Sequence, residues 1–347
     1  MKRFIKIKMK ILELTNYSAG ICGVFQRVKQ EAELLSKKHE VMIFSSNATK
    51  GSKEIAKPED LLNGIKIKRF PFIKLGGESF MSWNFYSAAL DFAPDIIIAH
   101  GFRHLHTVKA LKIKEKLNCK VFLVTHAPFI ENNSTRSFLS KLVVSFYDKA
   151  MAKAHLNKFD KIIHITHWEV PYLLELGAEK EKLVYIPNGI PDKFFEIPCQ
   201  RGSGILFLGR VSQIKNLEVL IRGVKNTPYT LDIVGPAEEK YKQELLNLIK
   251  KEDIKNVGFF PPVFNIKEKI SLIDKHEIFV LPSWREAMPQ SLIEAMSRKK
   301  IIISSETQGG REIISNGKDG LLFPINNEPA LSALLKRISK MPENEKK

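Results

Sequence analysis

The sequence predicts an α/β protein that contains two doubly wound parallel sheets. Three observations lead to this prediction. Short apolar runs alternate with helical segments along most of the chain, as in buried parallel strands joined by crossover helices. A segment rich in Pro and Gly, residues 187–202, divides the alternation into two series and predicts a hinge. The length of 347 residues also exceeds that of most single cores and suggests two domains.

The first series opens with an apolar strand at residues 11–14, a loop at 16–23 and a helix at 24–37. Its further strands are expected at residues 41–46, 65–70, 95–99, 120–125, 162–166 and 183–186, and its further helices at residues 105–117 and 137–155.

The second series has its strands at residues 205–208, 230–234, 257–259, 278–281 and 301–303. Its helices are expected at residues 216–224, 240–251, 266–275, 289–298 and 328–341, with one more opening at Gly309-Gly310. Pro289 fits a first helical position because its missing N–H would have no partner there. The predicted divisions are a first domain at 1–195, a second at 196–325, and a terminal helix in 326–347 that could pack back on the first domain.

Composition limits the class of protein. The three cysteines, Cys22, Cys119 and Cys199, lie far apart, which fits a reduced cytosolic protein without a disulfide framework or a zinc site. No apolar run is long enough to span a bilayer, and residues 1–10 are basic but lack the apolar core of a secretory signal. The formal net charge of +17 favours nucleic acid, anionic membrane or phosphorylated substrates as partners.

The stretch from residue 278 to residue 324 suits a phosphorylated ligand. Two helices are expected to begin there, near Pro289 and near Gly310, at the carboxyl ends of strands. Helix N-termini present free N–H groups and a partial positive charge to such a ligand. Glu294, inside the first helix, could accept hydrogen bonds from sugar hydroxyls, and Glu286, in the loop before it, could hold a second polar group.

Three segments in this stretch resemble the donor-binding region of family 4 retaining glycosyltransferases. They are the glutamate pair Glu286 and Glu294, then Gly309-Gly310-Arg311-Glu312, then residues 316–322. Residues 209–216 resemble the same family's segment that carries an arginine and a lysine after a strand. The resemblance implies the GT-B fold, in which two Rossmann-like domains face each other across a cleft.

The resemblance also implies roles for individual residues. Arg210 and Lys215 would hold the donor diphosphate, Glu294 the ribose, and Glu286 with the backbone of residues 288–290 the donor sugar. Two fixed cations would stabilise the charge that the leaving diphosphate gains, so that no metal is implied. The complete donor-binding set that we predict is Gly20, Gly23, Arg210, Lys215, Glu286, Met288, Pro289, Gln290, Ser291 and Glu294.

This chain departs from the family pattern in two places. Ala287 and Met288 stand where the family usually has a glycine and an aromatic residue, and residues 298–301 replace a frequent Gly-x-Pro. These departures bear on the identity of the donor more than on activity.

Two histidines, His100 and His126, each follow a predicted strand, and carboxyl ends of parallel strands line the ligand crevice. By resemblance, His126 is the better candidate for contact with the transferred sugar, and we count His126, Glu286, Arg210 and Lys215 as catalytic. Gly20 and Gly23 would let the backbone approach a ligand, although a plain turn is an alternative. They do not form a dinucleotide fingerprint, and the second strand ends in Ser45-Ser46 without an acidic residue, which argues against NAD.

The predicted function is a retaining hexosyltransferase that moves a sugar from a nucleoside diphosphate sugar to the hydroxyl of a lipid-linked or envelope glycan. The donor is a substrate, and no separate cofactor is expected. A sugar-nucleotide epimerase, a glycosidase with two carboxylates and a basic RNA-binding protein are the alternatives, although no aromatic RNA-stacking signature is visible.

The basic first half adds an expectation about location. Residues 101–160 carry eleven Lys or Arg against four Asp or Glu, and aromatic residues near Trp83 and Phe85 lie among further cations. If those rings are exposed, the pattern suits a membrane interface. The alternative, which we favour slightly, is that they are buried aromatics beside a solvated strand. We therefore expect a cytoplasmic protein with peripheral association at the inner face of an anionic membrane, and no nucleic-acid partner.

Overall fold

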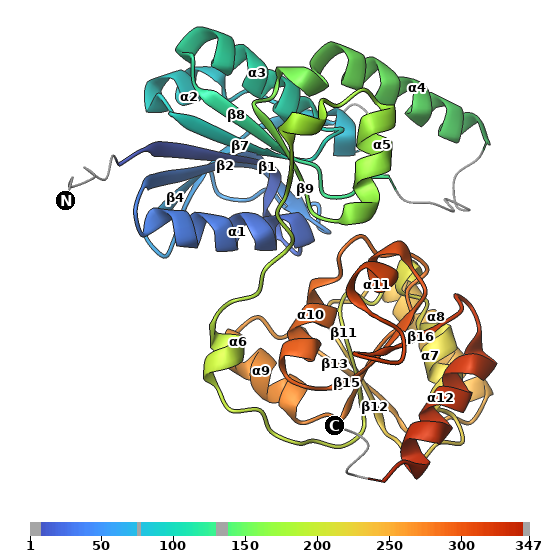
Figure 1. Ribbon diagram of the computed structural model, residues 1–347. Helices are drawn as coiled ribbons and strands as arrows, with labels where there is room; N and C mark the ends of the chain where they lie inside the picture. Colours follow the sequence, from blue (N-terminus) through green and yellow to red (C-terminus); the bar gives the residue numbers. More distant parts are fainter. Residues whose placement is uncertain (1–7, 75–77, 130–137, 343–347) are drawn as a thin grey trace, which may run out of the picture. The chain divides into compact units, whose positions relative to one another are not determined.

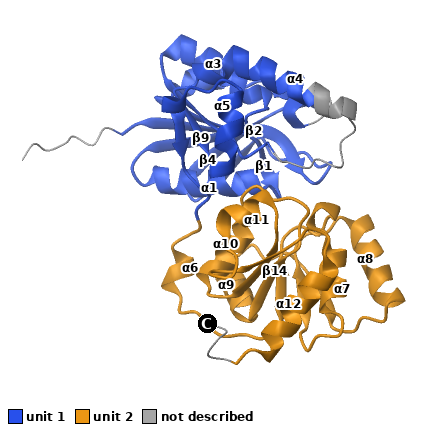
Figure 2. Cartoon of the chain, turned by 45° about the vertical axis from the view of Figure 1, so that its right-hand side comes forward, with its two compact units in different colours: residues 1–189 blue, residues 190–347 orange. Residues whose placement is uncertain are grey.

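The computed structural model describes residues 8–74, 78–129 and 138–342, and within α4 it leaves the side chains of residues 138–143 aside. The predicted helix start at Ser137 and most of the basic N-terminal segment therefore lie outside the described residues. The chain forms two compact units, residues 1–189 and residues 190–347 (Figure 2).

The first unit is built on an eight-stranded sheet in the order β10-β9-β8-β7-β1-β2-β4-β3 (Figure 1). The strands are β1 (Lys10–Gly20), β2 (Glu40–Lys50), β3 (Glu59–Leu62), β4 (Ile65–Phe70), β7 (Ile96–His100), β8 (Lys120–Val124), β9 (Lys161–His164) and β10 (Leu183–Tyr185). All neighbours pair in parallel except β3, which lies antiparallel on β4. The small strands β5 (Phe72–Lys74) and β6 (Met81–Trp83) form a separate antiparallel pair. The predicted doubly wound parallel sheet is confirmed.

Helices cover both faces of this sheet (Figure 1). They are α1 (Gly23–Ser36), α2 (Tyr86–Phe92), α3 (Leu105–Leu117), α4 (Phe138–His155) and α5 (Val170–Glu175). Helix α1 packs Val28 and Ala32 against Ile11 and Ile43 of the sheet. Helices α2 and α3 pack on the opposite face, because Leu12 and Leu14 of β1 belong to their core.

The second unit holds a six-stranded, all-parallel sheet in the order β13-β12-β11-β14-β15-β16. Its strands are β11 (Ile205–Leu208), β12 (Leu231–Val234), β13 (Val257–Phe260), β14 (Ile278–Leu281), β15 (Ile301–Ser305) and β16 (Leu321–Phe323). Its helices are α6 (Lys193–Glu196), α7 (Leu217–Val224), α8 (Glu239–Lys251), α9 (Ile266–Asp274), α10 (Gln290–Ser297), α11 (Gln308–Ile313) and α12 (Glu328–Lys340). In both units the strand order reverses at the first strand, which is the arrangement of a doubly wound fold.

The ends of the second unit differ from the predicted domain limits. Residues 190–195 lie with this unit, since Phe194 is fully buried in its core. Helix α12 packs on α7 of the same unit, where Leu331 would meet any Cβ added at Gly223. The buried residues of α12 belong to the core of the second unit. The described part of the tail is thus an integral element of that unit.

Two central rings of the aromatic stretch, Trp83 and Phe85, are buried, so the condition set for a membrane interface is not met. Trp83 and Phe85 are each 2% exposed, with ring centroids 4.5 Å apart. Trp83 also stacks on Phe70 and donates its indole N–H to Asn16. These rings therefore cannot form a membrane interface. Among the described residues, we find no helix that is long and apolar enough to cross a membrane.

Candidate active site

A lysine and a glutamate meet at the carboxyl edge of the second sheet. Lys215 lies in the loop that follows β11, and Glu286 lies in the loop that follows β14. The two strands are neighbours, although they are distant in sequence, and they flank the point where the strand order reverses. The Lys215 ammonium is 2.5 Å from Oε1 of Glu286, and the Ser283 hydroxyl donates to the same oxygen at 2.6 Å. Ligands bind at such a switch point in open α/β sheets.

Backbone contacts fix the Glu286 loop against the next βα connection. The Gly309 N–H donates to the Glu286 carbonyl at 3.0 Å. A Cβ at Gly309 would lie 2.5 Å from the carbonyl oxygen of Ala287, so the close approach requires glycine. The Thr307 hydroxyl caps α11 by accepting from the Gly310 N–H. The connections that follow three neighbouring strands of the sheet, β11, β14 and β15, therefore converge on Glu286.

Glu294 lies inside α10, with its side chain almost completely buried. The Lys269 ammonium of α9 donates to its Oε1 at 2.9 Å. Burial raises the pKa of Glu294, and the positive charge of Lys269 opposes that shift. Pro289 is the N-cap of α10 and not its first helical residue, so the helix starts with Gln290 and Ser291. Lys269 was not predicted, because its contact depends on how α9 and α10 pack.

Arg210 lies two residues after the end of β11, in a loop whose backbone is closely packed. The next residue, Val211, forms a bridge with Ala237, and the Gly209 N–H donates to Val234. Gly235 has a φ of +149°, and a Cβ there would lie 1.9 Å from the Gly209 carbonyl oxygen. Gly235, which was not predicted to have a role, thus allows the two loops to touch.

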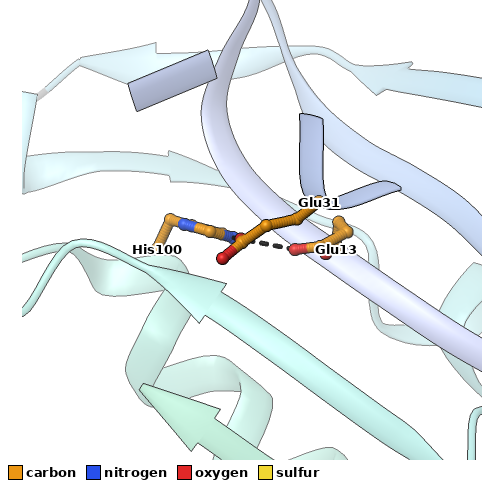
Figure 3. A group of neighbouring side chains, drawn as sticks. All are labelled: Glu13, Glu31 and His100. Carbon is orange, nitrogen blue, oxygen red and sulfur yellow. Dashed lines mark hydrogen bonds and ion pairs between the residues drawn. The ribbon is translucent and has the colours of Figure 1, made fainter. Parts of the chain in front are cut away.

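In the first unit, His100 and His126 lie together, as expected from two neighbouring strand ends. Nδ1 of His100 is 2.9 Å from Nε2 of His126. The other nitrogen of His100, Nε2, is 2.7 Å from Oε2 of Glu13, a fully buried residue of β1 (Figure 3). Glu31 of α1 approaches the same nitrogen at 3.6 Å. Glu13 was not predicted as a site residue, although a charged residue inside an apolar strand is a signal for one.

His126 stands on a strained turn. His126 and Ala127 have φ values of +59° and +49°, a conformation that costs energy in residues other than glycine. Glu169 holds this turn from the adjacent connection, because its buried Oε1 accepts from the Ala127 N–H at 2.8 Å and from the Thr125 hydroxyl. Strain that the surroundings maintain in this way is frequent at functional sites. Glu169 gave no signal in the sequence.

Of the two glycines near β1, Gly20 has a structural explanation, whereas no contact requires glycine at position 23. The predicted loop at residues 16–23 is wrong, because β1 continues to Gly20 and pairs there with Lys50 of β2. A Cβ at Gly20 would lie 2.3 Å from the Lys50 carbonyl oxygen, and its φ of +77° also favours glycine. Gly23 is the first residue of α1, with open space around its Cα.

Family models match both halves of the chain. The model "Glycosyltransferase Family 4" matches residues 21–194, and "Glycosyl transferases group 1" matches residues 199–347. The chain belongs to glycosyltransferase family 4. A similar protein is an α-1,4-N-acetyl-D-galactosaminyltransferase of Campylobacter jejuni, 24% identical over 322 residues, which cover 88% of this chain and 82% of that one. The name of that enzyme gives an undecaprenyl-diphosphate-linked glycan as its acceptor. The chain spans less than two thirds of some other relatives that it matches.

Solved structures show that this glycosyltransferase has the GT-B fold, as predicted. Sucrose-phosphate synthase from Thermosynechococcus elongatus matches with a TM-score of 0.74 at 16% identity, covering 96% of this chain and 90% of that one. HepE from Anabaena, solved in complex with UDP-glucose, matches with a TM-score of 0.73 at 16% identity, covering 97% and 91%. At this sequence identity the likeness establishes the fold alone and does not assign the substrates of these proteins to this chain.

Proposed function

We propose that this glycosyltransferase moves a sugar from a nucleoside diphosphate sugar to a hydroxyl of a polyprenyl-diphosphate-linked glycan, with retention at the anomeric carbon. The observation that carries the proposal is the convergence of Lys215 and Glu286 at the switch point of the second sheet. The relative from Campylobacter jejuni supports the class of acceptor, and HepE bound to UDP-glucose supports the class of donor. Incubation with a panel of UDP- and GDP-sugars and such an acceptor, with the product anomer determined by NMR, tests it.

In this proposal each residue acts on a defined part of the donor. Arg210 and Lys215 bind the diphosphate, so that their charges stabilise the leaving group as it departs without a metal ion. Glu294 accepts hydrogen bonds from the ribose hydroxyls. Glu286 and the backbone of residues 288–290 hold the transferred sugar, which also contacts His126. A donor phosphate oxygen takes the acceptor proton on the face that the leaving group vacates, which gives retention.

Replacing Glu294 by alanine is expected to weaken binding of UDP, the probe nucleotide, by about 10- to 150-fold, which is the loss of one hydrogen-bonded, ionised acceptor. Isothermal titration of the variant against the wild type measures the change. Lys269 is partly exposed, so its ammonium can reach solvent when Glu294 is removed. Glu244→Ala on the exposed face of α8 is the matched control. Unchanged UDP affinity in the Glu294 variant would remove the ribose role.

We further propose that the first unit docks on anionic membrane to reach this acceptor. The support is the excess of eleven basic over four acidic residues between positions 101 and 160. Each basic residue near the surface contributes about 1 kcal/mol, and the attraction falls within a Debye length.

Sedimentation with phosphatidylglycerol vesicles should therefore fall as salt rises and vanish with phosphatidylcholine alone. The double charge reversal Lys112→Glu with Lys116→Glu on exposed sites of α3 should weaken it. The control reverses Lys250 and Lys251 of α8 in the second unit, which changes the net charge equally. Equal recovery with both vesicle types at low salt would exclude membrane docking and leave the transferase assignment intact.

A further inference from the structure

A polar group is buried between α1 and the sheet of the first unit, on a face that is otherwise apolar. Glu13 lies on β1, and its register partners Ile43 of β2 and Ile98 of β7 are aliphatic. Glu13 and His100 have no exposed surface at all. A buried carboxyl is costly unless its environment compensates for the lost water. Apolar packing therefore does not explain why a carboxyl group occupies position 13.

Glu13, His100 and His126 form a continuous hydrogen-bonded line. The line runs from Oε2 of Glu13 to Nε2 of His100 over 2.7 Å, and from Nδ1 of His100 to Nε2 of His126 over 2.9 Å. Figure 3 shows the carboxyl groups of Glu13 and Glu31 turned toward the His100 ring. His126, at the end of the line, is partly exposed, whereas the other two are not.

The line permits two arrangements of protons, because each neutral imidazole carries one N–H. If the Glu13 carboxyl is protonated, it donates to His100, His100 donates from Nδ1 to His126, and His126 carries its proton on Nδ1. If Glu13 is ionised, the direction of each hydrogen bond reverses. Nε2 of His100 then donates to Glu13, Nε2 of His126 donates to His100, and Nδ1 of His126 becomes an acceptor. The protonation of Glu13 thus determines what His126 offers to a substrate.

The surroundings of Glu13 favour the protonated arrangement at neutral pH. Burial raises the pKa of Glu13 to about 8, against the influence of the Arg27 guanidinium, and lowers the pKa of His100 to about 4. The charged groups that face this pair are Arg27 and Glu31, both from α1, and they form an ion pair with each other at 2.8 Å. Arg27 is further held by the Ile186 carbonyl at 2.9 Å, so its charge is fixed in place.

We propose that Glu13 and His100 are positioning residues, which hold the His126 ring in one orientation and in the tautomer that carries its proton on Nδ1. The proposal rests on the proposed function, in which His126 contacts the transferred sugar. His126 then donates a hydrogen bond to a sugar oxygen from Nδ1. The strained turn at His126 and Ala127 fixes the backbone of this donor, and the line to Glu13 fixes its ring.

The same residues do not suit a divalent metal. Glu13, Glu31 and His100 offer ligand atoms within 4.8 Å of one another. Two ligands of a tetrahedral zinc ion, each about 2.1 Å from the metal, lie about 3.4 Å apart. Glu13 and His100 are 2.7 Å apart, which is a hydrogen-bond distance. The guanidinium of Arg27 beside Glu31 also opposes a second positive charge.

The first test reads the tautomer directly and needs no activity. Long-range ¹H–¹⁵N spectra of the imidazole rings, assigned with His100→Asn and His126→Asn, should show His126 protonated on Nδ1 at pH 6.5. By pH 9 the proton should move to Nε2 in the wild type and stay on Nδ1 in Glu13→Gln. A wild-type His126 protonated on Nε2 at pH 6.5, or no change by pH 9, would overturn the proposal. The proposal would also be overturned if the wild-type protein binds a stoichiometric amount of metal and the Glu13→Gln variant does not.

The second test uses the transferase reaction. Glu13→Met removes both donor and acceptor and should lower turnover about 10- to 100-fold, by analogy with the loss of the orienting partner of a metal-bound histidine. UDP affinity should stay at the wild-type value. Glu13→Gln should restore most of the turnover and should lack the decline that the wild type shows as pH rises through 8. Equal activity of the Met and Gln variants, or wild-type activity that increases through pH 8, would contradict the proposal.

One control and one possible outcome separate this proposal from the proposed function. Glu59→Gln on the exposed edge strand β3 matches the change of charge. If the wild type shows the predicted tautomer change but transfers no sugar from any donor, the proposed function is refuted. The positioning of His126 by Glu13 and His100 is then still supported.

Stability gives a readout of the buried proton itself. The pKa of Glu13 is near 8 in the folded state, against an ordinary value of 4.5 in the unfolded chain. The contribution of this group to the free energy of unfolding is therefore fully present below pH 4.5 and is lost as the pH rises to 8. The stability of Glu13→Gln relative to the wild type should therefore increase over that range, and a constant difference would show that Glu13 is ionised throughout.

Discussion

Replacing Lys215 by alanine is expected to lower the turnover of this glycosyltransferase roughly 100- to 1000-fold, the usual loss when one preorganised group that stabilises developing charge is removed. The leaving diphosphate gains negative charge in the transition state, so the ammonium stabilises it more than the bound donor. The apparent donor constant should therefore rise much less than turnover falls. Steady-state kinetics with the donor found in the nucleotide-sugar panel measure both quantities.

The fold should tolerate this substitution. Lys215 is partly exposed, and Glu286 keeps the hydrogen bond from Ser283 when the lysine is lost. Lys255→Ala, at a highly exposed lysine of the same unit, is the control for loss of one charge. Near-normal turnover in the Lys215 variant would refute the phosphate role. The same assay with EDTA tests the metal-independent proposal, which loss of activity restored by magnesium or manganese would contradict.

The pattern of apolar residues was sufficient to predict strands and helices that are buried between other elements. Strand β4 (Ile65–Phe70) and helix α3 (Leu105–Leu117) have the predicted limits. Strand β3 (Glu59–Leu62) was missed, since it is an exposed antiparallel edge with acidic residues and lacks the signal of a buried strand. The end of β1 was read as a loop because residues 16–20 are polar and contain a glycine. Pairing with β2 extends the strand there.

The candidate site was predictable only where residues resemble a family segment. Lys215 and Glu286 were named from such segments, and the strand order explains their contact. Glu13 and His100 come together because β1 and β7 are neighbours at the switch point, and no local pattern in the sequence contains that information. The sequence left two positions open for Trp83, because aromatic residues beside cations look alike in a core and on a membrane surface, and the structure places it in the core. The position of a side chain between two elements decides such cases.

Arg298 illustrates the same limit, since its sequence position pointed to the donor and its contacts point to the fold. Its side chain is 1% exposed and pairs with Asp274, with Nε 3.0 Å from Oδ1 and Nη2 2.5 Å from Oδ2. The guanidinium also donates to the carbonyls of Phe194, Ile197 and Pro198 at 2.6–2.8 Å. Arg298 thus attaches the segment around α6 to the second unit.

We therefore expect Arg298→Met to destabilise the second unit by about 3–5 kcal/mol, because the buried Asp274 carboxylate loses both hydrogen bonds from Arg298 and keeps, among the described residues, only the Lys300 ammonium, 3.7 Å away. Hydrogen exchange measured by mass spectrometry resolves the two units, and the protection of β11 and β14 should fall while that of β1 and β7 stays. Adding Asp274→Asn should recover part of the loss, since the uncompensated charge is then removed. Arg337→Met, at an exposed arginine of α12, is the matched control. If Arg298→Met leaves the protection of β11 unchanged but alters the choice among nucleotide sugars, the departure at residues 298–301 concerns the donor after all, and the role of Arg298 as a clamp is wrong.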